Sequence, residues 1–268
     1  MYASEIITDI TSDIPFPYLL EPFAKFKLRH YKCEVQELGK LHRYAAVANL
    51  SYELDAVCGG RFSLCSSMSA GSRHYRNLDW GVEGLKRWKV FERSGKAGPF
   101  RVVGVDGMIG VLTGCAKGRF SISVNADLMD CEFCLTGSPI GVLVRMTLEE
   151  CRSAKEAIEF FMRKKTMRSS FVHIVSCDGE SFVVRASRKP DLLKMSYVTN
   201  HNPTLEPEYD EGCEAYKDSY ARLCAMKNEG SKTMAKEPVH NELTVQSIVM
   251  DSRTGEVSDN VRNAKNMV

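Results

Sequence analysis

The sequence predicts an α+β protein in which antiparallel sheets carry helices on their outer faces. Three observations support this fold class. Apolar residues alternate with polar ones in two regions, which lie on either side of a region with a helical repeat. Dipeptides typical of tight β-turns, Asp106-Gly107 and Asp178-Gly179, fall between predicted strands. The resulting order of helix, strands, helices and strands favours sheets covered by helices.

The N-terminal part is predicted to be mainly helical over residues 23–58. Apolar side chains recur there at steps of three and four between Leu38 and Tyr52, which gives one apolar face. The pair Gly59-Gly60 ends this segment with a flexible break. The run Phe62–Met68 then predicts a short strand that contains Cys65.

The first region of alternation continues with four predicted strands. These are Lys86–Glu92, Phe100–Asp106, Met108–Thr113 and Phe120–Ala126. Asn125 stands at the end of the last strand, and residues 127–137 are predicted to form a loop. Helical steps from Ile140 to Lys164 then predict two helices that are broken near Ser153, a favourable N-cap.

The second region of alternation predicts three strands, a helix and a last strand. The three strands are Phe171–Cys177, Ser181–Ala186 and Met195–Asn200. His173 alternates within an apolar run, which is typical of a hydrogen-bonded core histidine. An acidic loop at 204–215 precedes a helix over Tyr216–Lys227. The strand Leu243–Met250 follows, and Arg253-Thr254-Gly255 is predicted to be a turn.

Composition excludes several classes of protein. The chain has 268 residues and a formal net charge of +2, which gives no argument for nucleic-acid binding. Its apolar runs are shorter than the ~18–20 residues that span a bilayer. Residues 1–22 lack the basic start and apolar centre of a signal peptide. A cytoplasmic location is therefore expected, or a lysosomal or secreted one if a targeting segment has been removed.

The ten cysteines are scattered along a chain that is too long for a small disulfide scaffold. Reduced thiols are therefore expected. Cys131 and Cys134 form a CxxC motif that has no second pair and no histidine pair at ligand spacing. The sequence thus predicts no zinc site, no other metal and no organic cofactor.

The chemistry of the sequence centres on Cys65, which is followed by Arg76 and Asp79. A nucleophilic thiol needs cationic and hydrogen-bonding neighbours, and this stretch offers both. Taken alone, however, the stretch is more typical of a buried core cysteine beside a surface ion pair. Asn125 and Asn200, each at the end of a predicted strand, add two amides to the pattern.

Seven segments in order resemble the N-terminal-nucleophile hydrolases of the cholylglycine hydrolase type. The chain is most similar to their acid ceramidase and N-acylethanolamine acid amidase branch. The segments are Tyr52-Glu53, Cys65-Ser66-Ser67, Arg76–Trp80, Gly110–Gly114, Ser121–Asn125, Val198–Asn200 and Pro238–Val245. Two positions depart from the family's pattern, because Ser66 replaces its usual threonine and Tyr75 replaces its usual glycine.

The resemblance implies a four-layer αββα fold that matures by cutting its own chain between Leu64 and Cys65. Residues 1–64 would become a small subunit that stays bound, and residues 65–268 the catalytic domain. Such chemistry requires an N-terminal nucleophile, because a free α-amino group with a pKa of ~7.7–8 can act as the base, whereas an amide nitrogen cannot.

The resemblance also implies roles for six residues. Cys65 would attack the substrate carbonyl and form a thioester. Asp79 would orient the new α-amino group, and Arg76 would stabilise thiolate or oxyanion charge. Asn125, through its backbone N–H, and Asn200, through its side chain, would form the oxyanion hole. Arg222 is the candidate for an arginine expected late in the chain, although an exposed helical arginine is an equal alternative there.

The implied function is hydrolysis of a linear, non-peptide amide, such as an N-acylethanolamine or a ceramide. The expected partner is a small acyl-amide substrate, and a homo-oligomer is left open. Two alternatives remain. An acyltransferase would pass the acyl group to an amine instead of water. An uncleaved, inactive homologue would serve as a binding module.

Overall fold

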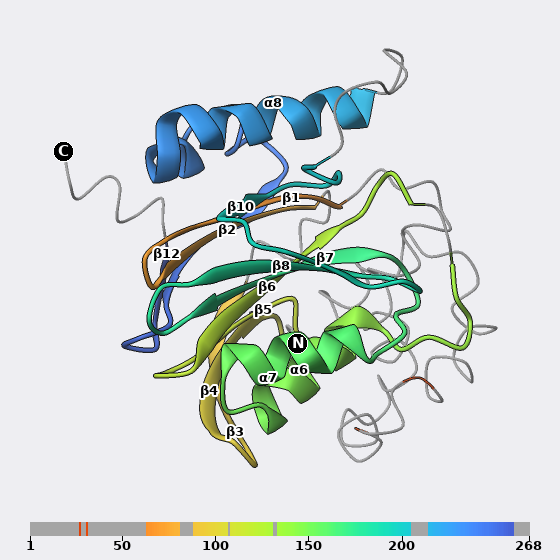
Figure 1. The fold of residues 1–268 in the computed structure, drawn as a ribbon. Coiled ribbons are helices and arrows are strands. Elements are labelled where there is room, and N and C mark those ends of the chain that lie inside the picture. The colour runs from red at the N-terminus through yellow and green to blue at the C-terminus, as the bar shows by residue number, and fades with distance from the viewer. Residues whose placement is uncertain are drawn as a thin grey trace.

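The structure is a computed structural model that describes Lys27, Tyr31 and residues 63–80, 88–106, 108–130, 133–204 and 214–259. Two antiparallel sheets lie face to face between two layers of helices, as Figure 1 shows. The predicted α+β class and the αββα arrangement are therefore confirmed. The helix expected over 23–58 lies outside the described residues, apart from Lys27 and Tyr31.

The first sheet has five strands in the order β10-β1-β2-β11-β12. Their bounds are Tyr197–Val198 for β10, Ser63–Ala70 for β1, Arg73–Trp80 for β2, Thr244–Asp251 for β11 and Glu256–Asp259 for β12. The strand that contains Cys65 is therefore not an edge strand, because β1 pairs with β2 on one side and with β10 on the other.

The second sheet has seven strands in the order β3-β4-β5-β6-β7-β8-β9. The first four are β3 (Lys89–Gly95), β4 (Gly98–Gly104), β5 (Thr113–Ala116) and β6 (Phe120–Ala126). The last three are β7 (Ser170–Ser176), β8 (Ser181–Ala186) and β9 (Asp191–Leu193). Strands β6 and β7 are buried along their whole length, as expected for the centre of a sheet that is covered on both faces.

Helices cover the outer face of each sheet. α6 (Ile140–Glu150) and α7 (Ala154–Met162) pack on the second sheet, whereas α8 (Glu214–Glu229) and the 3₁₀ helix η4 (Gly230–Ala235) pack on the first (Figure 1). The predicted break at Ser153 is confirmed, since its side chain caps α7 by accepting a hydrogen bond from the Glu156 N–H. None of the described helices is long and apolar enough to cross a membrane.

Two strand predictions were wrong. Met108–Thr113 is not a strand, because β5 begins only at Thr113. The Val111 N–H donates instead to the Gly141 carbonyl of α6, at 2.9 Å, so this apolar run is buried against a helix. The predicted strand Met195–Asn200 is reduced to Tyr197–Val198 and joins the first sheet, whereas the short β9, which was not predicted, pairs with β8.

Candidate active site

Cys65 lies in β1 with its side chain fully buried between the two sheets. In the antiparallel pairing of β1 and β2, Cys65 lies opposite Leu78 and Ser67 lies opposite Arg76. Because side chains alternate between the faces of a strand, Cys65 and Arg76 share the inner face. The Arg76 Nη2 donates a hydrogen bond to the Cys65 Sγ at 3.1 Å.

The Arg76 guanidinium is itself completely buried and bound to the neighbouring sheet. Its Nη1 donates to the Asn125 Oδ1 at 3.2 Å and to the Asn77 carbonyl at 2.6 Å. Its Nη2 also donates to the Val124 carbonyl at 2.5 Å. The end of β6 therefore fixes the Arg76 guanidinium against the thiol.

The backbone of Cys65 is held on both sides by side chains from other elements. Its N–H donates to the Asn200 Oδ1 at 2.7 Å. Its carbonyl accepts hydrogen bonds from the Asn125 Nδ2 at 3.2 Å and from the Arg222 Nη1 at 2.6 Å. The Asn200 Nδ2 is bound to the Ala126 carbonyl at 2.9 Å. Four of the six predicted site residues thus contact Cys65 directly.

Arg222 reaches Cys65 from α8, on the outer side of the first sheet, and is fully buried. Its Nη1 donates to the Ser66 Oγ at 2.8 Å, and its Nη2 donates to the Asn200 Oδ1 at 3.1 Å. Its Nε donates to the Asp218 Oδ2 at 2.8 Å, one turn earlier in the helix. The structure therefore excludes the alternative of a solvent-exposed arginine at this position.

Asp79 lies on the other face of β2, opposite Leu64 in the strand pairing. Its carboxylate accepts hydrogen bonds from the Thr244 Oγ1 at 2.6 Å and from the Asn241 Nδ2 at 3.1 Å. It is therefore beside the main chain that immediately precedes Cys65, and it does not share the inner face with Arg76.

Sequence reasoning gave no role to four side chains that support these residues. They are Ser66, Asp218, Asn241 and Thr244. The last two lie within the segment Pro238–Val245, which had been noted only as part of the family resemblance. The spacing of Asp218 and Arg222, four residues apart on a helix, was the one local signal available.

The electrostatics of the site are set by burial. Burial raises the pKa of the Cys65 thiol, and the charge and hydrogen bond of Arg76 act against this increase. Burial also raises the pKa of the Asp79 carboxyl, which the Thr244 hydrogen bond and the Arg222 charge oppose. In the continuous chain the Cys65 nitrogen is an amide donor, so it cannot take the thiol proton.

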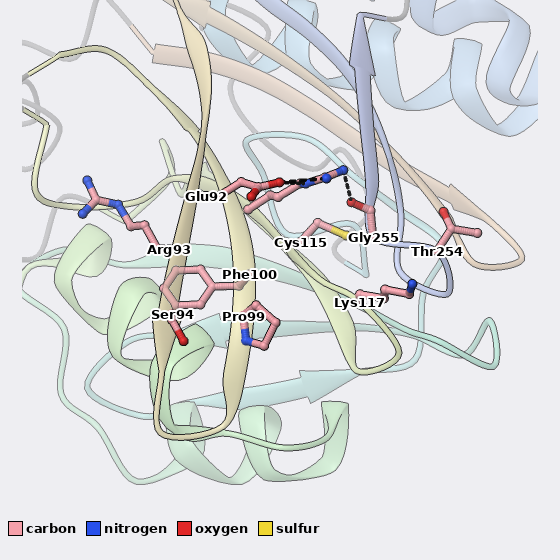
Figure 2. Close-up of a pocket in the computed structure, with 10 residues that line it drawn as sticks. Glu92, Arg93, Ser94, Pro99, Phe100, Cys115, Lys117, Thr254 and Gly255 are labelled. Carbon is pink, nitrogen blue, oxygen red and sulfur yellow. Dashed lines mark hydrogen bonds and ion pairs between the residues drawn. The ribbon is translucent and has the colours of Figure 1, made fainter.

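A separate hollow of about 560 Å³ lies between the β3–β4 hairpin and the turn that joins β11 to β12 (Figure 2). Its lining includes Glu92 and Arg101, which form an ion pair of 2.8 Å, and the buried thiol of Cys115. None of its lining residues belongs to the cluster around Cys65. Among the described residues, no group of three or more potential ligands could hold a metal ion.

Comparisons with known proteins find similar sequences. The model of the family described as acyl-coenzyme A:6-aminopenicillanic acid acyl-transferase matches residues 123–252. Acid ceramidase of Pan troglodytes is 25% identical over 266 aligned positions, which cover 80% of this chain and 64% of the relative. Acid ceramidase of Homo sapiens is 24% identical with the same coverage. The chain thus spans somewhat less than two thirds of the curated relatives that it matches.

Among solved structures, the Caenorhabditis elegans ortholog of N-acylethanolamine-hydrolyzing acid amidase superimposes with a TM-score of 0.56. It is 22% identical, and the match covers 70% of this chain and 93% of that one. This likeness bears on the fold alone. Taken together, the sequence matches and the αββα architecture make the chain similar to the N-terminal-nucleophile hydrolases of the cholylglycine hydrolase type, on the acid ceramidase-like branch.

Proposed function

We propose that the chain is a self-processing cysteine amidohydrolase that cleaves a linear, non-peptide amide by way of a thioester at Cys65. The observation that carries this proposal is the contact of Arg76 with the Cys65 thiol, together with side-chain hydrogen bonds to the Cys65 N–H and carbonyl. A core cysteine needs no cation at its thiol, whereas a nucleophilic thiol needs cationic and hydrogen-bonding neighbours.

Processing would begin with attack of the Cys65 thiol on the Leu64 carbonyl carbon. The bond from that carbon to the Cys65 nitrogen breaks as the new thioester forms, and the departing nitrogen, which is then no longer an amide, takes up the proton that the thiol has lost. Water then hydrolyses the thioester, which leaves a carboxylate on Leu64 and a free α-amino group on Cys65. Asp79 lies opposite Leu64 and is therefore the carboxylate best placed to hold that amino group.

The free amino group supplies the base that the continuous chain lacks. It takes the proton of the thiol, and the thiolate attacks the carbonyl carbon of the substrate amide. Arg76 offsets the thiolate charge, and Asn125 with Asn200 would donate to the developing oxyanion. The departing amine takes up the proton, and water releases the acyl group from Cys65 as a free acid.

The small N-terminal part carries two described side chains that contact the catalytic part. The Tyr31 hydroxyl donates to the Glu149 Oε2 at 2.8 Å, and the Arg145 guanidinium lies 3.9 Å from the centre of the Tyr31 ring. The Lys27 Nζ donates to the carbonyls of Leu135 and Gly137. These contacts support the proposal that residues 1–64 stay bound after the chain is cut.

Replacement of Tyr31 by alanine should weaken that retention by about a hundredfold in Kd, since a buried aromatic anchor is lost. Tyr31→Phe is the matched control, because it removes the bond to Glu149 and keeps the ring against Arg145. Gel filtration of the processed protein, with denaturing mass analysis of each fraction, measures how much of the small fragment co-elutes. Full retention in Tyr31→Ala would mean that other contacts hold the fragment.

The substrate class is proposed from the names of the relatives, which are a ceramidase and an N-acylethanolamine-hydrolyzing amidase. Both names denote enzymes that act on N-acyl amides. The processed protein should therefore release free fatty acid from N-acylethanolamines or ceramides, as measured by mass spectrometry over a panel of chain lengths. A panel of acyl dipeptides is the control, and turnover of these alone would overturn the assignment to non-peptide amides.

An acyltransferase is the second candidate, because the matching family model describes an enzyme that transfers an acyl group to an amine. The two functions share the thioester and differ in the group that attacks it. Adding a primary amine to the same assay distinguishes them. A new N-acyl amide formed at the expense of free acid, at millimolar amine, would indicate a transferase.

A further inference from the structure

A cluster of polar side chains fills part of the space between the two sheets, beside Cys65 and Arg76. All of its members are buried. They are Ser67, His74, Ser121, Ser123, His173 and Ser181. The inside of a two-sheet sandwich is normally apolar, and a buried polar network is retained at a cost in stability. Such a network beside a candidate nucleophile therefore calls for a physical account.

The centre of the cluster is the Ser67 hydroxyl. It lies 2.8 Å from the His74 Nε2, 2.6 Å from the His173 Nδ1 and 3.0 Å from the Ser123 Oγ. The outer nitrogens of the two rings are bound as well. The His74 Nδ1 lies 3.0 Å from the Ser121 Oγ, and the His173 Nε2 lies 2.7 Å from the Ser181 Oγ.

Both imidazoles are neutral in this setting. Burial, together with the positive charge of Arg76, lowers the pKa of His173 to about 3. Burial, followed by His173 and Arg76, lowers the pKa of His74 well below its usual range. A neutral ring has one donor and one acceptor, which hydroxyl groups can match in either tautomer. The cluster therefore adds hydrogen bonds beside Arg76 without adding a second positive charge.

The register of the strands ties this cluster to the candidate active site. Ser67 is the cross-strand partner of Arg76 and lies two residues after Cys65 on the same face of β1. His74 lies two residues before Arg76 on the same face of β2. His173 belongs to β7, in the opposite sheet, and pairs with Ser123 of β6. The Ser67 hydroxyl thus links the two sheets. The first sheet carries Cys65 and Arg76, and β6 of the second sheet binds the Arg76 guanidinium.

We propose that Ser67, His74 and His173 act as positioning residues, an inter-sheet clamp that holds Arg76 against the Cys65 thiol. Within the described part of the chain, the guanidinium donates hydrogen bonds to two carbonyls, one amide oxygen and the thiol, and to no carboxylate. Because Ser67, His74 and His173 are neutral and fix the spacing of the two sheets, the positive charge of Arg76 is available to the Cys65 thiolate. This inference rests on the proposed role of Cys65 as nucleophile.

Four histidine variants test the clamp in a crossed design. An asparagine amide can replace the Nδ1 of histidine, and a glutamine amide can replace its Nε2. His74→Gln and His173→Asn therefore keep the contact with Ser67, whereas His74→Asn and His173→Gln lose it and keep the outer contacts. All four variants remove an imidazole ring from the same buried cluster. A general loss of stability would therefore affect all four, and would not separate the two that keep the contact with Ser67 from the two that lose it.

The measurement is the rate at which iodoacetamide alkylates Cys65 in the processed protein, followed over pH by mass analysis of its peptide. Cys177, a half-buried thiol in the β7–β8 hairpin, is the internal reference. In His74→Asn and His173→Gln, which lose the contact with Ser67, we expect Cys65 to be alkylated about tenfold more slowly at pH 7. The midpoint of the pH profile should shift upward, because less of the Cys65 thiol is ionised. The two matched variants should stay within about threefold of the unmodified protein.

Two further outcomes keep this inference separate from the proposed function. If Cys65 of the unmodified protein reacts no faster than Cys177, the nucleophile itself is wrong and the clamp fails with it. If Cys65 is reactive but its pH midpoint is the same in all four variants, the clamp alone is overturned. Ser67→Ala gives an independent check, with Ser252→Ala as control for loss of a buried serine that hydrogen-bonds elsewhere.

Discussion

Replacing Cys65 by alanine is expected to leave a single chain of 30.1 kDa under conditions in which the unmodified protein divides into two fragments. The reason is chemical, because the thiol that attacks the Leu64 carbonyl is absent and no other described side chain is placed to replace it. Amide hydrolysis should fall to background as well. Intact-mass analysis over time, at several pH values, measures the first effect directly.

The control for this prediction is Cys177→Ala, which removes a free thiol far along the chain and should be processed at the unmodified rate. Cleavage that persists in Cys65→Ala would assign the cut to another nucleophile or to a protease. An unmodified protein that stays whole at every pH would favour the alternative of an uncleaved binding module. Hydrolysis that is unaffected in Cys65→Ala would remove this cysteine from the mechanism.

Replacing Arg222 by lysine should lower kcat for amide hydrolysis by about 10²–10³-fold, although the positive charge is kept. The planar guanidinium binds the Cys65 carbonyl, the Asn200 Oδ1 and Asp218 at the same time, and a single ammonium group cannot. Without the bond from Arg222, Asn200 would lose its orientation as an oxyanion donor, and loss of one such oriented donor typically has this magnitude. Steady-state kinetics on the processed protein gives kcat and KM separately.

The matched control is Asp218→Asn, which removes the ion pair at the outer end of Arg222 and leaves its contacts with Cys65 and Asn200. Because the Asp218 side chain is partly exposed, we expect less than a tenfold loss of kcat there. A lysine variant that stays within threefold of the unmodified enzyme would show that Arg222 serves the fold rather than the reaction. Thermal unfolding of both variants checks that the comparison is made between folded proteins.

The sequence was most informative where the local pattern and the final environment agree. Phe120–Ala126 alternates strictly and became β6, and the polar Ser153 between two apolar helical runs became the cap of α7. Met108–Thr113 misled because an apolar run has the same composition in a strand and in a segment that packs on a helix. The short β9 was not predicted, and β10 was predicted too long and without its partner β1, which is distant in sequence.

The site was predictable only as a set of residue types. Cys65, Arg76, Asn125 and Asn200 could be named because the family resemblance supplied their roles, and the structure brings them together. Their supporting contacts could not be named, because Ser66 meets Arg222 across 156 positions and Thr244 meets Asp79 across 165. His173 was correctly interpreted as a hydrogen-bonded core residue, but its neighbours in the opposite sheet were not foreseen.

The pairing of β1 has one more consequence for the mature protein. The Leu64–Cys65 bond lies inside a paired strand, with Ser63 opposite Trp80 and Leu64 opposite Asp79. Cutting that bond would therefore leave the new C-terminus at Leu64 still paired with β2, directly beside Cys65. We expect the cut end to fray from β2 before any substrate can enter. Substrate hydrolysis would then begin after a lag. The length of this lag would be set by the rate at which the end at Leu64 separates from β2, and not by the rate of chain cleavage.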